Sequence, residues 1–217
     1  MVAYITPEKM ESITVKILTD YEDVNIGVDN PTLPIPIEEI IEFHFDLSIL
    51  WENINYLNPS ETVMAAIFPN KKVIVMNESQ RGLFEEKIGT MNFTFAHELG
   101  HWVLHATDDS QLCFDMTGKN KVFYCRSVSN KPPEEIQADM FASSLLMPKT
   151  LIISSIKKLK KNGTVQWTDL YELKDKFDVS ITALTTRLQY LNLLYIDKNK
   201  VIHNSKEEAS GQMALDL

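Results

Sequence analysis

The chain has 217 residues, 44% hydrophobic and 24% charged, which fits one globular domain or a domain with a small appendage. Its net charge of −9 argues against a surface built mainly to bind nucleic acid, and two cysteines, Cys113 and Cys125, are too few for a disulfide framework or a four-thiolate zinc site. No apolar run reaches the roughly 18 residues of a membrane span, and Glu8 and Glu11 stand where a signal peptide needs an apolar run, so we expect a cytoplasmic protein.

The N-terminal part of the chain predicts two helices. Residues 7–21 place apolar side chains at helical spacing, Thr6 is a suitable capping residue, and Pro7 suits the first position of a helix. A proline-rich stretch then interrupts the chain before a short helix that we expect around residues 37–43.

The next segment predicts β-structure followed by a long helix. Two β-rich runs, residues 62–68 and 72–78, are separated by a short turn and predict a hairpin. Residues 79–89 are predicted to be a loop. Thr90 is the candidate cap of the apolar helix that comes next.

Helices are predicted again after a polar segment. Residues 107–131 indicate a loop or a small hairpin. A pair of prolines at 132 and 133 opens a helix that Pro148 ends, and another helix is predicted over residues 149–162.

The last quarter of the chain has the pattern of a helix-turn-helix. The apolar residues of 170–177 lie on one face of a first helix, and Ser180 is a cap for a second. Residues 193–202 predict a small β-wing after it. Residues 204–217 lack periodicity and are predicted to be a mobile tail.

The stretch "TFAHELGHWVLH", residues 94–105, predicts a metal site. His97 and His101 are four residues apart, so on a helix both imidazoles face the same ion. Zinc binds His nitrogen at about 2.0 to 2.1 Å, which would fill two of its four positions. Glu98 is placed to take a proton from a metal-bound water. Chance produces H-E-x-x-H in a chain of this composition with a probability of about one in a hundred, so a third ligand is needed.

The third ligand is expected on the second strongly predicted helix. Glu135 and Asp139 are four residues apart and share a face, which suits a carboxylate ligand followed by an outer carboxylate that orients a ligand histidine. Glu134 is the alternative ligand. The alternative explanation of both glutamates is that acidic side chains are favoured in the first turn of a helix, whether or not a metal is bound. His105 lies about 12 Å along a continuous helix from His97, so we assign it a supporting role outside the ligand set.

Small residues on both helices predict a close contact between them. Ala138 and Ala142 flank the face that carries Glu135, and Gly100 lies within the histidine motif. Because the distance between two packed helices depends on the side chains at the contact, residues of this size allow a close approach.

With both helices in view, the sequence resembles the ImmA/IrrE family of zinc metallopeptidases, cytoplasmic bacterial proteins often carried by mobile elements. The resemblance rests on residues 93–105 and 135–148 and on the β-rich run 73–78. Residues 176–194 are also similar to the helix-turn-helix-like segment that follows the peptidase core in this family. Together these segments cover most of residues 1–195, a combination far more specific than HExxH alone.

The resemblance implies an α+β fold in which a zincin-like peptidase core, made of helices with a small antiparallel β-sheet, precedes a helix-turn-helix-like segment. We assign the core to residues 1–150 and the helical, helix-turn-helix-like segment to residues 151–203. Residues 204–217 are the flexible tail.

The resemblance also implies a gluzincin-type site, with His97, His101 and Glu135 as Zn²⁺ ligands and Glu98 as the general base. The family's typical second motif has Asn where this chain has Asp139, which can still orient a histidine. Members of the family cleave a helix-turn-helix transcriptional repressor of a mobile element or a stress response at one place. The expected function is therefore zinc-dependent, site-specific cleavage of such a protein.

The main alternative is a regulator that binds DNA or protein, with a zinc that is only structural. Residues 157–200 contain 9 Lys or Arg and 5 Asp or Glu, a local charge of +4 in a chain of −9. Direct DNA binding through this segment is the alternative role, although a solvated helix surface is the commoner reason for such a charge pattern.

Two further hypotheses concern the loop between the motifs. Tyr124 and Arg126 are candidate donors to the oxyanion of a peptidase, although ordinary loop residues are the favoured explanation. Cys113 and Cys125 would face each other across a hairpin, and plain packing is again favoured over a redox or metal-regulatory role.

Overall fold

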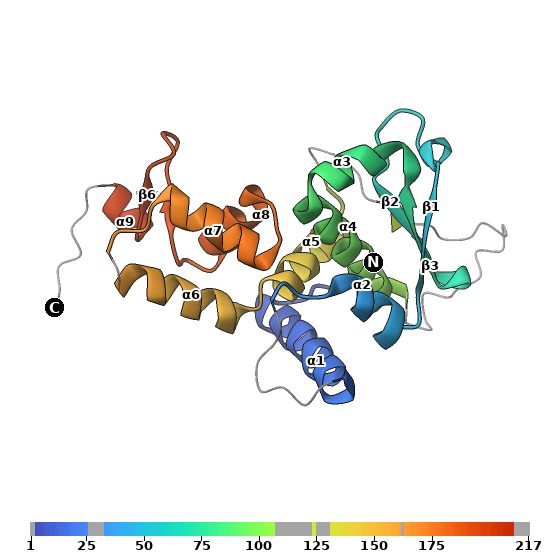
Figure 1. Ribbon diagram of the computed structural model, residues 1–217, viewed down its shortest axis with the longest axis horizontal. Helices are drawn as coiled ribbons and strands as arrows, with labels where there is room; N and C mark the ends of the chain where they lie inside the picture. The colour runs from blue at the N-terminus through green and yellow to red at the C-terminus, as the bar shows by residue number, and fades with distance from the viewer. Residues whose placement is uncertain (1–2, 26–32, 107–122, 125–130, 162, 211–217) are drawn as a thin grey trace. The chain divides into compact units, whose positions relative to one another are not determined.

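The computed structural model describes residues 3–25, 33–106, 123–124, 131–161 and 163–210 (Figure 1). Contacts within the chain divide it into two compact units, Met1–Leu146 and Met147–Leu217, and each is described by itself. Most described elements are helices and the sheets are small, so the predicted α+β class is confirmed. No helix of the described residues is long and apolar enough to cross a membrane.

The first unit contains a sheet with the strand order β1-β3-β2-β4. Its strands are β1 (Ser48–Glu52), β2 (Ala65–Phe68), β3 (Val73–Asn77) and β4 (Phe123–Tyr124). β2 and β3 form the predicted hairpin and pair antiparallel, and β4 pairs antiparallel with the other edge of β2. β1, which no sequence pattern predicted, pairs parallel with β3.

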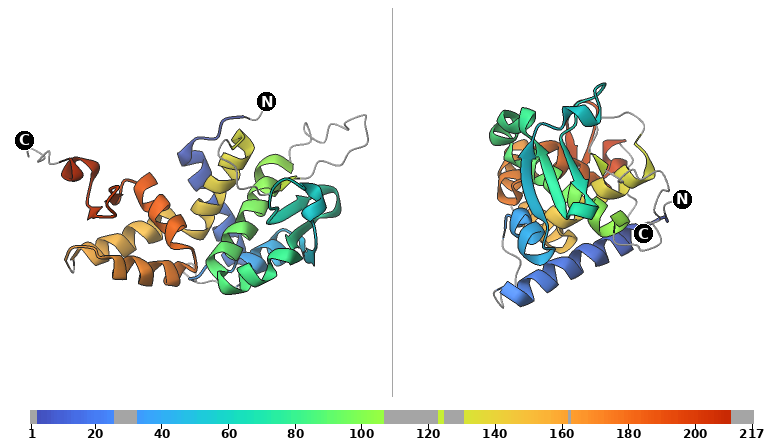
Figure 2. Two further views of the ribbon diagram at one scale, coloured as in Figure 1. Left: turned by 90° about the horizontal axis from the view of Figure 1, so that it is seen from above. Right: turned by 90° about the vertical axis from the view of Figure 1, so that its right-hand side faces the viewer.

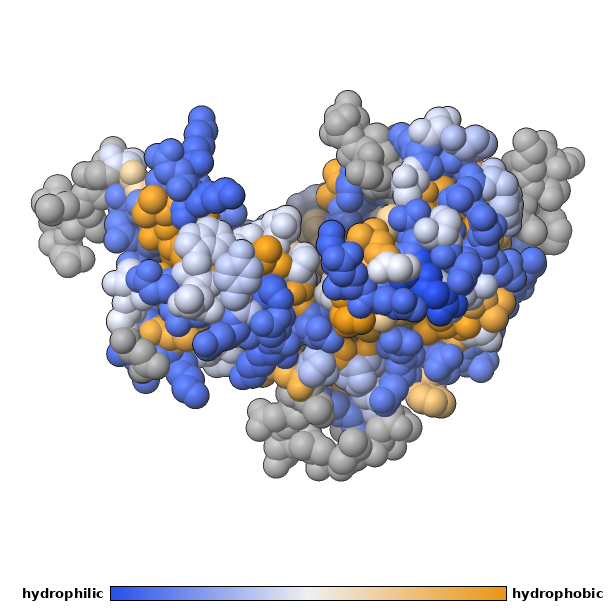
Figure 3. Space-filling view, turned by 45° about the horizontal axis from the view of Figure 1, so that its top comes forward, coloured by the Kyte–Doolittle hydropathy of each residue, from blue (hydrophilic) through white to orange (hydrophobic). Residues whose placement is uncertain are grey.

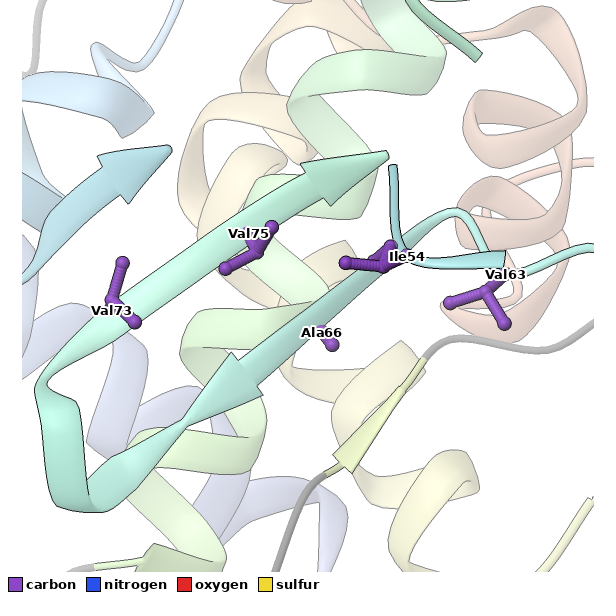
Figure 4. Close-up of a cluster of buried hydrophobic side chains, with 5 residues drawn as sticks. All are labelled: Ile54, Val63, Ala66, Val73 and Val75. Atoms are coloured by element: carbon purple, nitrogen blue, oxygen red, sulfur yellow. The ribbon is translucent and has the colours of Figure 1, made fainter. Parts of the chain in front are cut away.

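One face of this sheet carries a hydrophobic cluster of its own (Figure 4). Val73 and Val75 occupy alternate positions of β3, and Ala66 of β2 lies opposite Val75. Ile54 and Val63, from the segment between β1 and β2, pack against them. All five residues of β3 are buried, so the strand is covered on both faces and gives the helices of this unit a rigid support.

The two N-terminal helices are confirmed. α1 (Pro7–Asn25) begins at the predicted proline, and Thr6 Oγ1 accepts a hydrogen bond from the backbone N–H of Lys9 at 3.3 Å. The second is α2 (Ile37–Glu39), which continues as a π-helical turn over Ile40–His44.

The loop predicted for residues 79–89 is wrong, because a helix, α3 (Arg81–Glu86), lies there. Phe84 of α3 is fully buried, and its ring meets the ring of Trp51 edge-on with centroids 5.8 Å apart. This contact depends on β1, so local spacing gave no sign of it. The next helix, α4 (Ile88–His101), begins before Thr90, so Thr90 is not its cap.

α5 (Pro133–Leu146) confirms the second strongly predicted helix and packs against both α4 and α1 (Figures 1 and 2). Ser144 Oγ donates to Glu11 Oε1 of α1 at 3.3 Å. Gln137 Nε2 donates to the backbone carbonyl of Ala3 at 2.7 Å. These bonds fix the position of α5 along α1 and the N-terminal segment.

The second unit confirms the predicted helix-turn-helix. Its helices are α6 (Lys149–Lys161), α7 (Trp167–Phe177) and α8 (Ile181–Tyr190). Ser180 Oγ accepts a hydrogen bond from the backbone N–H of Ala183 at 3.0 Å, so Ser180 caps α8 as predicted.

A two-stranded sheet follows α8 and confirms the predicted wing. β5 (Tyr195–Ile196) and β6 (Ile202–His203) pair antiparallel. The predicted tail differs in part, because α9 (Lys206–Ala209) forms a short helix capped by the Ser205 hydroxyl. Residues 211–217 lie outside the described residues.

Charge is distributed unevenly between the two units. Residues 1–146 have 10 Lys or Arg and 22 Asp or Glu, a net charge of −12, whereas residues 147–217 have 11 and 8, a net charge of +3. On the face drawn in Figure 3, hydrophilic residues cover much of each unit. The net charge of −12 makes the first unit strongly acidic.

Candidate metal centre

Helices α4 and α5 approach each other closely at Gly100. A Cβ atom added to Gly100 would lie 3.2 Å from the Cα atom of Ala138 and 3.1 Å from Cδ1 of Phe141. These separations are tighter than ordinary van der Waals contact, so a larger side chain requires the neighbouring helix to move. The predicted close contact at Gly100 and Ala138 is confirmed.

This contact brings two histidines of α4 and one glutamate of α5 together. His97 and His101 have no exposed surface, and Glu135 is 7% exposed. His97 Nε2 lies 3.1 Å from His101 Nε2 and 3.2 Å from Glu135 Oε2. His101 Nε2 lies 3.4 Å from Glu135 Oε1. Within the described part of the chain, these three side chains converge as a group that could hold a metal ion, and Glu134 is not in it.

The separations between these ligand atoms match the size of a zinc site. Zinc binds His nitrogen and carboxylate oxygen at about 2.0 to 2.2 Å, so a tetrahedral site places neighbouring ligand atoms about 3.3 to 3.5 Å apart. The two histidine Nε2 atoms lie 3.1 Å apart, and each lies 3.2 to 3.4 Å from the Glu135 oxygen nearest to it, Oε2 for His97 and Oε1 for His101. Two imidazoles and one carboxylate leave the fourth position for water or substrate, which is typical of catalytic zinc.

Asp139 determines the tautomer of His97. His97 Nδ1 lies 3.0 Å from Asp139 Oδ1, and an ionised carboxylate only accepts hydrogen bonds, so Nδ1 carries the proton. Burial raises the pKa of the Asp139 carboxyl, but the contacts with His97 and Lys131 outweigh this effect and hold the pKa below its ordinary value. Nε2 of His97 therefore keeps a lone pair for a metal ion.

The charge states of His101 and Glu135 also suit metal ligands. Burial lowers the pKa of His101 to about 4, against the opposing effect of its contact with Glu135. Burial raises the pKa of Glu135, but its contacts with His101 and His97 hold that pKa well below its usual range. At neutral pH His101 is neutral and Glu135 is charged, the forms that bind metal.

Glu98 and His105 are buried, and both lie within a few residues of the candidate histidine ligands in the sequence. Glu98 follows His97 in α4 and has no exposed surface. α4 passes into a π-helical turn, Trp102–Ala106, which carries His105. The ring centroid of His105 lies 5.7 Å from that of His101, and His105 is not in the converging group. This geometry supports a role for His105 beside a ligand.

One charged residue at this site was missed by the sequence reasoning. Lys131 Nζ lies 2.5 Å from Asp139 Oδ2. Lys131 precedes α5, so no helical spacing connects it with Asp139. The two hypotheses about the loop between the motifs concern four side chains that lie outside the described part of the structure: Cys113, Tyr124, Cys125 and Arg126.

Comparison with known families agrees with this geometry. The family model Peptidase_M78, described as the IrrE N-terminal-like domain, matches residues 66–189. The match covers more than half of the chain and includes both helices of the metal centre. No curated protein matches the chain.

The close approach at Gly100 predicts an unusual response to alanine. Gly100→Ala should lower the free energy of unfolding by about 1 to 3 kcal/mol, because overpacking exceeds the gain in helix propensity. Gly82 of α3 is the matched control, since a Cβ there meets nothing within 4 Å. Gly82→Ala should raise the free energy of unfolding by about 0.5 to 1 kcal/mol. Chemical denaturation measures both, and equal stabilisation by the two substitutions would contradict the packing argument.

The buried His101 predicts that the metal-free protein loses stability in acid. Unfolded His101 titrates near 6.5 and folded His101 near 4, so between these pH values only the unfolded state takes up the proton. The free energy of unfolding should fall by about 3 kcal/mol as the pH is lowered through this window, and Glu135 adds a loss of the same sign below pH 4.5. Denaturation of chelator-treated protein measures this. His101→Gln should flatten the slope between pH 6.5 and 4, and an unchanged slope would refute the assignment.

Proposed function

The chain belongs to the Peptidase_M78 family of metallopeptidases, and from this premise we propose that it is a zinc-dependent endopeptidase. His97, His101 and Glu135 are the proposed zinc ligands, and Glu98 is the proposed general base. The substrate is a protein cleaved at one site, for which we propose a helix-turn-helix transcriptional repressor of a mobile element or a stress response.

The observation that carries the proposal is the convergence of three buried side chains: His97 Nε2 and His101 Nε2 lie 3.1 Å apart, and each lies 3.2 to 3.4 Å from one carboxylate oxygen of Glu135. The two contacts with Glu135 join helix α4 to helix α5, so the arrangement does not follow from the spacing of the histidine motif alone. His97 presents Nε2 to the centre because Asp139 accepts the proton of Nδ1. These features fit zinc with one open position.

Three side chains near the proposed ligands have separate tasks in the proposed reaction. A bound zinc ion would supply a Lewis acid that polarises the scissile carbonyl and makes water a better nucleophile at neutral pH. Glu98 takes a proton from the attacking water and passes it to the leaving amine. Asp139 holds the ring of His97 in place during both steps. His105 packs beside His101 and limits its movement.

The charge of the first unit supports a basic substrate. Its net charge of −12 attracts positively charged partners over distances of about a Debye length. DNA-binding proteins carry clustered Lys and Arg because they neutralise phosphates. A helix-turn-helix repressor is therefore a partner of complementary charge.

The second helix of the helix-turn-helix offers little support for the alternative of a DNA-binding regulator. Arg187 is the basic residue of α8, the second helix of the helix-turn-helix, and it is 1% exposed. Its Nε and Nη2 donate to the backbone carbonyl of Met147 at 3.2 and 3.1 Å. The exposed positions of α8 are Thr182, Thr186 and Tyr190, which bring no positive charge to a phosphate. A role in holding a protein substrate fits this neutral face better.

Removing the proposed base should separate metal binding from catalysis. Glu98→Gln should keep one zinc ion per chain and lower kcat/KM for a helix-turn-helix repressor substrate by at least about 100-fold, because no carboxylate accepts the proton. Glu134→Gln, on α5 but outside the converging group, is the matched control and should cleave normally. Metal analysis and single-turnover cleavage measure the two properties. Wild-type cleavage by Glu98→Gln would exclude the mechanism.

Charge attraction predicts a salt-sensitive reaction. The value of kcat/KM for a basic repressor should fall at least about threefold between about 0.05 and 0.5 M salt, because salt screens the attraction. A short neutral peptide containing the same scissile bond should show little salt dependence. Equal salt dependence of protein and peptide would mean that the acidic surface does not attract the substrate.

A further inference from the structure

The carboxylate of Asp139 is held at both of its oxygens. Oδ1 lies 3.0 Å from His97 Nδ1, and Oδ2 lies 2.5 Å from Lys131 Nζ. The side chains of Lys131 and Asp139 are 32% and 30% exposed, whereas His97 is fully buried. The ion pair therefore lies at the edge of the site, with the histidine behind it. Such charge-assisted hydrogen bonds are short and about twice as strong as neutral ones.

Lys131 lies two residues before the first residue of α5. Lys131 directly precedes two prolines, and the carbonyl of Pro132 accepts the N–H groups of Glu135 and Ile136 at 3.1 and 3.2 Å. Asp139 lies one helical turn after Glu135, on the same face. The ammonium group thus ties the segment that enters α5 to the face that carries both carboxylates.

We propose that Lys131 is a positioning residue of the metal centre, which acts through Asp139. It fixes the carboxylate in the orientation that holds the His97 ring with Nε2 toward the metal. With one oxygen bound to Lys131, the carboxylate cannot rotate without breaking a bond, so the other oxygen stays directed at Nδ1. This inference rests on the metal site of the proposed function.

The charge of Lys131 alone would have the opposite effect on metal binding. Glu135 and Asp139 bring negative charge to the region of the site, and a positive charge nearby repels a zinc ion. Removing Lys131 would therefore tighten zinc binding if its charge mattered more than its contact. If positioning dominates, removing Lys131 weakens zinc binding. The sign of the change decides between the two.

The first measurement is zinc affinity by competition with a chromophoric chelator. Loss of an outer-shell partner costs about 10- to 100-fold in metal affinity, and Lys131 acts one contact further out. Lys131→Met should therefore weaken zinc binding by about 3- to 10-fold. Lys131→Arg, which keeps a cation able to bind a carboxylate, should stay within about twofold of wild type.

The second measurement repeats Lys131→Met in the Asp139→Ala variant. With the carboxylate gone, Lys131 has no positioning effect on His97 and only its charge acts on the metal. Lys131→Met should then leave zinc affinity unchanged or raise it. A general structural role for Lys131 would instead weaken zinc binding in both backgrounds.

Lys72→Met is the matched control. Lys72 belongs to the same unit and forms an exposed ion pair with Asp46 at 3.1 Å, so its loss should leave zinc affinity unchanged.

The outcomes separate this inference from the proposed function. If wild type binds zinc and Lys131→Met binds it as tightly or more tightly, Lys131 is not a positioning residue and the metal site stands. If wild type binds no zinc, both ideas fail. Peptidase activity is not the readout, so a zinc-binding chain that cleaves nothing still decides the question.

Discussion

The close contact between α4 and α5 is the constraint on which the site depends. The helices meet where one has a glycine and the other an alanine, and only this approach lets Glu135 reach the two histidines. Each helix is supported from its other side, α4 by the sheet and α5 by α1. The ligand geometry therefore results from the packing of the whole first unit, and it is as rigid as that packing.

Burial then determines the chemistry of the ligands. Carboxylates and imidazoles taken out of water cost free energy unless charge partners or a metal compensate for the lost hydration. Burial keeps His101 neutral, and its contact with Glu135 keeps that carboxylate charged. Because burial removes these groups from water, the site without a cation lowers the free energy of unfolding of the first unit. Metal binding and the stability of this unit are therefore linked.

Local sequence patterns were sufficient wherever a feature depends on neighbours along the chain. The spacing of His97 and His101, the cap at Ser180 and the hairpin of β2 and β3 all follow from such rules. The four-residue spacing of Glu135 and Asp139 on the second helix made Glu135 the candidate third ligand, and the family resemblance supported it. Two contacts were not predictable from local spacing: Phe84 of α3 packs on a strand distant in sequence, and Lys131, which precedes α5, meets Asp139 eight residues later.

The aspartate at position 139 has a consequence for how this sequence diverges. Asn, typical of the family at this position, carries no charge and has no need of a neighbouring cation, whereas Asp139 occupies its second oxygen with Lys131. A lineage that exchanges Asp for Asn leaves the ammonium group of Lys131 at the edge of the site without its counter-charge. The two positions are therefore expected to covary, so that their identities are inherited as a pair.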